Sequence, residues 1–99
     1  MSDFTTGLSK AQMERLALLL EECGEVQQII GKILRHGYDS HHPENNLVNN
    51  RMLLEKELGD LQFAINLMVK KKDVDDVEMV EHTQEAWTKK KPYLHHQNI

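Results

Sequence analysis

The sequence predicts an all-α domain in which two long antiparallel helices form a hairpin and a third helix follows. Residues 12–35 and 50–71 each repeat apolar side chains at the three- and four-residue spacing of an amphipathic helix. A turn-rich run separates these two segments, and no segment alternates polar and apolar residues convincingly enough for a strand. At 99 residues the chain has the length of one domain, spanning 1–99.

The first helix has clear signals at both ends. Ser9 can cap its beginning while Gln12, three residues later, reaches back to the backbone of Ser9, which is the arrangement called a capping box. Only isolated glycines interrupt the pattern before Arg35. His36 and Gly37 then end the helix, and Gly37 suits a left-handed C-terminal cap.

The other elements follow from turn and capping residues. Residues 38–49 contain a proline and many turn formers, so we expect a loop there. The second helix runs from about Asn50 to Lys71. Asp73 is expected to cap a third helix that ends before Pro92, with acidic residues in its first turn and three lysines at its end.

Composition limits the class of protein and its compartment. With 39% hydrophobic and 28% charged residues the chain is globular, and its net charge of −4 argues against a nucleic-acid partner. The single cysteine, Cys23, excludes an internal disulfide, which suits a reducing compartment. No apolar run approaches the ~20 residues of a membrane span, and the N-terminal segment lacks the features of a secretory signal. We therefore expect a cytoplasmic protein without a membrane partner.

Acidic residues lie on the apolar faces of both long helices. On a helical wheel Glu22 falls between Val26 and Ile29, and Glu25 lies at the edge of the same stripe. In the second helix Glu57 is central to the apolar face, with Asp60 beside it. Residues three apart are neighbours on a helix surface, so each helix presents one acidic pair toward the predicted core.

Such acids need a compensating positive charge. Ionised carboxylates removed from water are destabilising unless they are paired, and no lysine or arginine shares the middle of either apolar stripe. A divalent cation is the simplest compensation, and a site with only oxygen ligands favours Mg²⁺, or Mn²⁺ in its place, over zinc. A di-iron bundle would need Glu-x-x-His pairs, which these faces lack.

The acidic motifs also resemble those of a known family. "EECGE" at 21–25 and "EKELGD" at 55–60 are similar to the EExxE…ExxD signature of MazG-like nucleoside triphosphate pyrophosphohydrolases, in the all-α NTP pyrophosphatase superfamily. The stretch at Asn50 and Arg51 resembles the short phage-type members. The 31 residues between Glu25 and Glu57 exceed the family's commonest spacing, and the loop at 38–49 would absorb them.

The resemblance implies a function and a set of site residues. It implies that Glu22, Glu25, Glu57 and Asp60 bind Mg²⁺, and that the protein cleaves nucleoside or deoxynucleoside triphosphates between the α and β phosphates. The products would be a monophosphate and pyrophosphate. Either Glu25 or Glu21 could orient or deprotonate the attacking water, and Glu25 is preferred because it lies nearer the acidic face.

Phosphate groups need cationic or polar contacts. The candidates for substrate binding are Arg51, Asn50, Lys32, Arg35, His36 and Lys89. For Lys89 and the two lysines after it there is an equally good structural explanation, because a basic run at a helix C-terminus complements the helix dipole without any ligand.

The helices leave apolar surface uncovered, because three helices cannot cover both faces of the hairpin. We therefore expect self-association as a homodimer that completes a four-helix bundle, or as a homotetramer. The alternative to an enzyme is a non-catalytic helical interaction module, whose acids form an acidic patch or hold a structural metal. Turnover of nucleotides with Mg²⁺ distinguishes the two.

Overall fold

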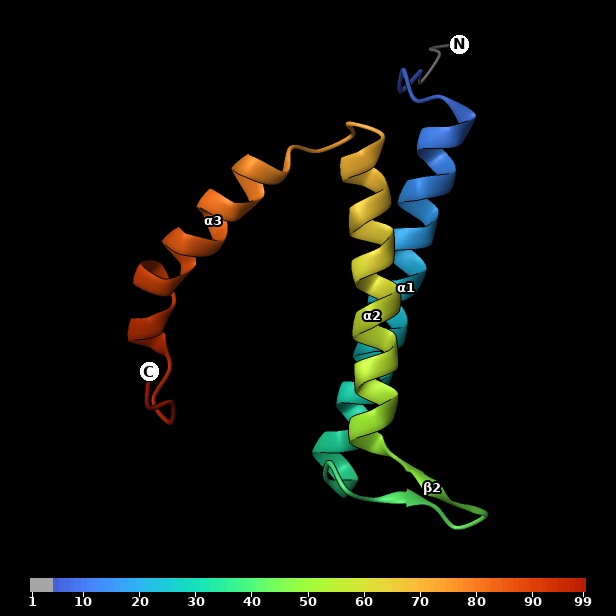
Figure 1. Ribbon diagram of the computed structural model, residues 1–99, viewed down its shortest axis with the longest axis vertical. Coiled ribbons are helices and arrows are strands. Elements are labelled where there is room, and N and C mark those ends of the chain that lie inside the picture. The colour runs from blue at the N-terminus through green and yellow to red at the C-terminus, as the bar shows by residue number, and fades with distance from the viewer. Residues whose placement is uncertain (1–4) are drawn as a thin grey trace.

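The computed structural model describes residues 5–99 and is mostly helical, as predicted (Figure 1). Residues 1–4 lie outside the described part of the chain. They belong to the N-terminal segment that was predicted to lack a targeting signal, so the structure does not describe all of that segment. The elements in order are α1 Lys10–His36, β1 His41–His42, β2 Asn45–Asn49, α2 Asn50–Lys70, α3 Asp76–Lys89 and the 3-10 helix Lys91–Tyr93.

Helix α1 begins and ends close to the predicted residues. The Gln12 backbone N–H donates to the Ser9 hydroxyl at 3.0 Å, and the Ser9 N–H donates to the Gln12 side chain at 2.8 Å, which confirms the capping box. At the other end Gly37 has φ 89°, a conformation that favours glycine. Its ψ of 168° is extended, so the chain turns directly away from the helix rather than through a left-handed helical residue.

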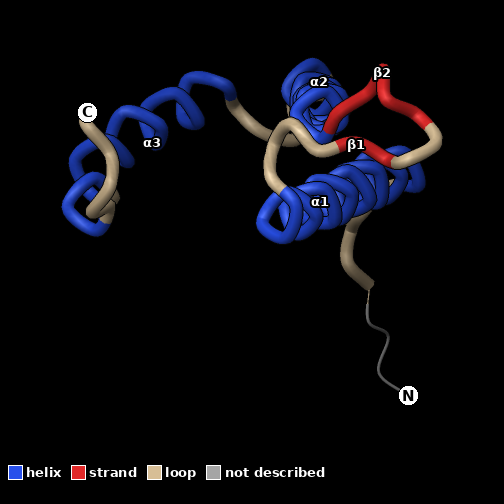
Figure 2. The backbone as a smooth tube through the Cα atoms, turned by 90° about the horizontal axis from the view of Figure 1, so that it is seen from below, coloured by secondary structure: helices blue, strands red, loops and turns tan. Residues whose placement is uncertain are grey.

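The prediction that no strands form was wrong for residues 41–49. Strands β1 and β2 pair antiparallel, with His41 opposite Asn49, His42 opposite Asn45 and an irregularity between the two histidines (Figure 2). A two-residue strand is too short to show alternation in the sequence. The turn is held locally, because the Glu44 N–H donates to His42 Nδ1 at 3.1 Å.

A buried asparagine at the start of α2 bonds to the end of α1 and to the loop that follows α1. Asn50, the first residue of α2, is 2% exposed. Its side-chain amide donates to the Gly37 carbonyl at 3.0 Å, and its backbone N–H donates to the Ser40 carbonyl at 2.9 Å. The start of α2 is therefore fixed against the end of α1, which sets the register of the two helices.

Helices α1 and α2 lie side by side along most of their length and enclose a small core (Figures 1 and 2). Its buried apolar residues, among those described, are Ile29, Ala64 and Met68. Many other apolar side chains remain exposed, including Leu20 at 76% and Phe63 at 60%. The predicted uncovered apolar surface is thus present, while its burial in an assembly stays a prediction.

Asp73 does not cap the third helix, contrary to the prediction. Its carboxylate accepts two hydrogen bonds from the Arg15 guanidinium, Nε to Oδ2 at 2.5 Å and Nη2 to Oδ1 at 2.9 Å. Asp75 is the cap instead, accepting from the Val77 N–H at 2.9 Å, so α3 begins at Asp76. The Arg15–Asp73 pair therefore joins the segment after α2 to the second turn of α1.

Acidification is expected to weaken this pair. The hydrogen bond from Arg15 is the main cause that lowers the pKa of Asp73; burial opposes it, and the positive charge of Arg15 adds a smaller lowering. The ionised carboxylate therefore stabilises the fold above about pH 4, the ordinary range for aspartate, and that stabilisation is lost as the pH falls through the lowered pKa. Thermal unfolding at pH 7 and pH 3 should show a smaller acid-dependent loss in Asp73→Asn than in wild type. The exposed control Glu44→Gln should behave as wild type, and equal losses in all three proteins would contradict this role.

Helix α3 extends away from the helical hairpin that α1 and α2 form (Figure 1). Its apolar side chains Val77, Val80 and Trp87 are 61%, 54% and 59% exposed. The predicted third helix is therefore present, but it does not pack along the hairpin in this structure. Along residues 5–99, every helix falls short of the combination of length and apolar character that crossing a lipid bilayer requires.

Candidate metal centre

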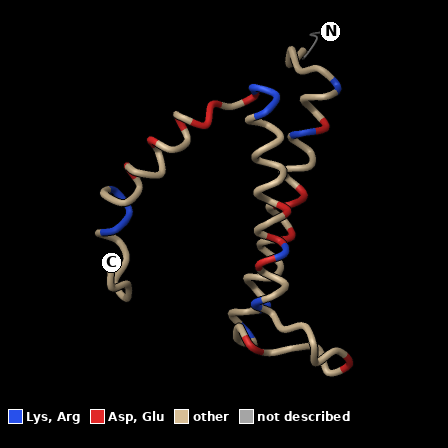
Figure 3. The backbone as a smooth tube through the Cα atoms, in the orientation of Figure 1, with Lys and Arg blue, Asp and Glu red and all other residues tan. Residues whose placement is uncertain are grey.

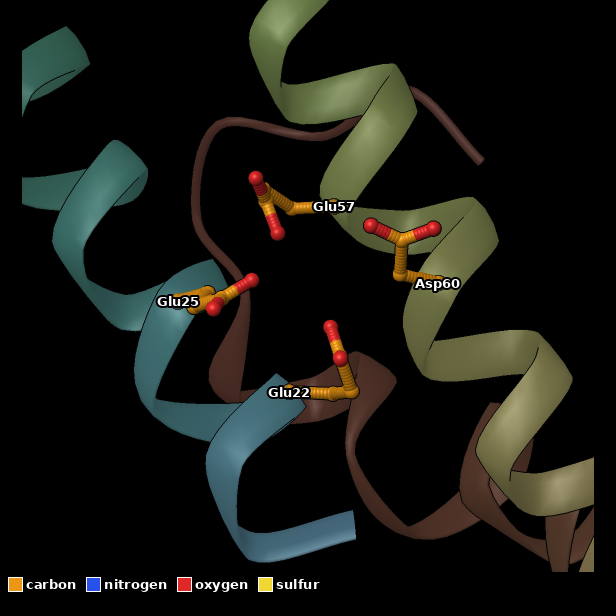
Figure 4. A group of neighbouring side chains, drawn as sticks. All are labelled: Glu22, Glu25, Glu57 and Asp60. Atoms are coloured by element: carbon orange, nitrogen blue, oxygen red, sulfur yellow. The ribbon is translucent and has the colours of Figure 1, made fainter. Parts of the chain in front are cut away.

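Four carboxylates from the two long helices meet at one point between them (Figure 4). Helix α1 supplies Glu22 and Glu25, and helix α2 supplies Glu57 and Asp60. One oxygen from each residue can be chosen such that all of these atoms lie within 4.8 Å of one another. We call these residues the acidic group. The sequence predicted one acidic pair on the core-facing side of each helix, and the packing of α1 on α2 brings the two pairs together.

Partial burial makes this arrangement electrostatically demanding. The Glu57 side chain is 17% exposed, and its Oε2 atom is buried without a hydrogen-bond partner, as is Oε2 of Glu22. Buried acceptors are nearly always satisfied in folded proteins. An all-oxygen donor set with two unsatisfied buried acceptors fits a hard divalent cation such as Mg²⁺ or Mn²⁺.

The group also shifts the protonation of one of its members. The pKa of Glu57 is raised, first because a proton on Glu57 can be shared with the adjacent Glu25 carboxylate, then by burial and by repulsion from Glu25 and Asp60. Lys56 opposes the shift through its positive charge. Crowding among the carboxylates thus favours retention of a proton over full ionisation.

This crowding predicts how pH and Mg²⁺ affect stability. Because the pKa of Glu57 is raised on folding, the folded state loses stability relative to the unfolded chain as the pH rises through and above the ordinary glutamate range of about 4.3. Mg²⁺ should therefore raise the melting temperature more at pH 8 than at pH 5, by about 3–6 °C at the higher pH. Calorimetry with Mg²⁺, or with Na⁺ at matched ionic strength, measures this. An equal effect of the two salts at pH 8 would contradict it.

Lys56 is a member of the site that helical-wheel reasoning missed. Its Nζ lies 2.8 Å from Asp60 Oδ2 and 3.7 Å from Glu57 Oε1. Within residues 5–99 no other lysine or arginine forms an ion pair with the acidic group. The wheel considered only the centre of the stripe, whereas a long side chain reaches in from its edge. The four-residue spacing of Lys56 and Asp60 was the signal that could have identified it.

An open hollow of about 410 Å³ lies beside the acidic group. Two lysines line it, Lys32 from α1 and Lys56 from α2, together with two members of the acidic group. Its lining residues are Glu25, Gln28, Ile29, Lys32, Leu53, Lys56 and Glu57. The predicted phosphate contact Lys32 therefore shares one hollow with Glu25 and Glu57.

Other predicted substrate contacts lie beyond this hollow or are engaged elsewhere. Arg51 stands over the Tyr38 ring, 4.4 Å from its centroid, with one guanidinium nitrogen 3.5 Å from Asp39. Arg35 and His36 are exposed in the last turn of α1. The side-chain amide of Asn50 is buried against Gly37, which gives that residue a structural role and leaves its side chain inaccessible to a substrate here.

Lys89 and Glu21 lie outside the acidic group. Figure 3 shows that the basic end of α3 lies away from the pair of helices α1 and α2. Lys89 belongs to this last turn of α3, and its ammonium is 3.1 Å from Glu85. Within one chain the structure does not bring it to the hollow, so a contact of Lys89 with substrate stays a prediction. Glu21 is exposed and is not part of the acidic group, which agrees with the prediction that Glu25 lies nearer the acidic face.

Comparisons with protein families, with curated proteins and with solved structures found no match to this chain. The chemistry of the site therefore has to be argued from its own residues. These are four convergent carboxylates, the Lys56 ammonium paired with Asp60, and Lys32, which lines the same hollow as Lys56.

Proposed function

We propose that this protein is a Mg²⁺-dependent nucleotide pyrophosphohydrolase, with Mn²⁺ able to replace Mg²⁺. The observation that supports it is the convergence of Glu22, Glu25, Glu57 and Asp60 within 4.8 Å next to a hollow lined by lysines. The resemblance of "EECGE" and "EKELGD" to the EExxE…ExxD motif points to the same reaction. The bond cleaved would be the anhydride between the α and β phosphates of an NTP or dNTP.

The four acids have the donor set needed to hold the ion. When bound, a divalent cation neutralises charge that develops on phosphate oxygens and lowers the pKa of a coordinated water. A polyphosphate carries several negative charges and cannot approach these carboxylates without such compensation. Glu22, Glu57 and Asp60 are assigned as ligands, and Glu25 is assigned a ligand role together with proton transfer.

Glu25 is the preferred general base. It belongs to the acidic group and also lines the hollow, so its carboxylate can accept a proton from water beside a bound phosphate. Glu21 is exposed outside the group, which makes it the weaker candidate. Lys32 also lines the hollow and would supply positive charge for the phosphate chain.

The proposal includes self-association and a cytoplasmic location. Exposed apolar side chains on the hairpin and on α3, such as Leu34 at 83%, favour a homodimer or homotetramer. In an assembly, the basic end of α3 from a neighbouring copy could bring Lys89 to the hollow, a contact that α3 does not make within its own chain. The single cysteine is consistent with a reducing cytoplasm.

A substrate panel tests this function. The protein is incubated with each NTP and dNTP, and with guanosine tetraphosphate, in the presence of Mg²⁺, and the products are separated by ion exchange. Monophosphate and pyrophosphate, formed with Mg²⁺ and absent with EDTA, are expected. Diphosphate and phosphate would identify a different reaction, and no turnover across the panel would favour the non-catalytic helical module.

A further inference from the structure

Lys56 lies where its ammonium can contact either the carboxylates of the acidic group or a phosphate bound in the hollow. Its ammonium is bonded to Asp60 at 2.8 Å and lies 3.7 Å from Glu57, and its side chain also lines the hollow shared with Lys32. The side chain is 64% exposed, so burial does not fix it to one partner. Lysine is already charged near neutral pH, and the hydrogen bond to Asp60 raises the pKa of Lys56 further.

A lysine in this position competes with a metal ion. It neutralises only one of the charges of the four acids, and it occupies one of the two oxygens of Asp60, a residue that a divalent ion would also use as a ligand. A divalent cation bound to the four acids would repel the nearby Lys56 ammonium, because both carry positive charge. The flexible four-carbon stem of lysine allows the ammonium to leave Asp60 without any movement of α2.

On the basis of the nucleotide hydrolase function proposed above, we propose that Lys56 is a substrate-binding residue controlled by the metal. It neutralises Asp60 and Glu57 until a divalent ion binds, and then turns into the hollow to bind a phosphate of the substrate together with Lys32. Metal binding would thereby prepare the phosphate site, because the ion that attracts the polyphosphate also releases an ammonium to receive it.

The first test measures metal binding alone. Calorimetric titration of the full chain with Mn²⁺, without nucleotide, compares wild type with Lys56→Gln and Lys56→Arg. Removal of the competing charge should tighten Mn²⁺ binding by about two- to fivefold in Lys56→Gln, as expected for an exposed ion pair. Lys56→Arg should show no such tightening. Lys70→Gln, an equal charge change at the end of α2, should leave the affinity unchanged.

The second test measures phosphate binding with the metal site saturated. At saturating Mn²⁺, affinity for inorganic triphosphate should fall about tenfold in Lys56→Gln and be largely retained in Lys56→Arg. Unchanged or weaker Mn²⁺ binding by Lys56→Gln, or unchanged triphosphate affinity, would overturn the role of Lys56 alone. Absence of Mn²⁺ binding by the wild-type protein would instead overturn the metal site of the proposed function, and the role of Lys56 with it.

Discussion

Replacing Glu57 by glutamine is expected to reduce Mg²⁺-dependent nucleotide hydrolysis by at least about 100-fold while the protein remains folded. Glu57 is the least exposed of the two α2 ligands, and one of its oxygens is buried without a hydrogen-bond partner. The amide keeps the size of the side chain but removes the charge that a hard cation requires. The loss should appear in turnover and in Mn²⁺ affinity together.

The fold of the Glu57→Gln protein should be at least as stable as wild type when no metal is present. The substitution removes one negative charge from a crowded group in which the pKa of Glu57 is already raised, first by Glu25. Circular dichroism and thermal unfolding in EDTA measure this. The control is Glu55→Gln, an exposed glutamate on the same helix, which should leave both activity and stability unchanged. Normal hydrolysis by Glu57→Gln would show that the site is assigned to the wrong residues.

The sequence was sufficient to predict the helices and the acidic group because both depend on local periodicity. Ser9 and Gln12 set the start of α1 through backbone hydrogen bonds three residues apart, and helical spacing places Glu22 with Glu25 and Glu57 with Asp60. Two successive antiparallel amphipathic helices pack on their apolar faces. Acids within those faces must therefore meet.

Contacts between distant segments could not be predicted in the same way. Asp73 had good capping chemistry, but Arg15, 58 residues earlier in the chain, forms two hydrogen bonds with it, so the cap moved to Asp75. Asn50 looked like a substrate contact next to Arg51, yet tertiary packing buries it against Gly37. In each case the side chain bonds to a residue outside its own helix. A helical wheel shows only the residues of one helix, so it could not predict that partner.

Ala64 connects the packing of the hairpin to the geometry of the site. It is 1% exposed in the small core and lies four residues after Asp60, one turn further along α2. Interiors are close-packed, so leucine at this position has no free volume to occupy. Either α1 and α2 separate or the leucine adopts a strained rotamer, and separation would draw Glu22 and Glu25 away from Glu57 and Asp60.

Ala64→Leu is therefore expected to lower the free energy of unfolding by about 1–3 kcal/mol and to weaken Mn²⁺ binding by about tenfold. Denaturant unfolding and calorimetric titration measure the two effects. Gln62→Leu introduces the same side chain at an exposed position of α2 and should leave metal affinity unchanged. If Ala64→Leu lost stability but bound Mn²⁺ as tightly as wild type, the claim that the spacing of α1 and α2 positions the four carboxylates for one ion would be wrong.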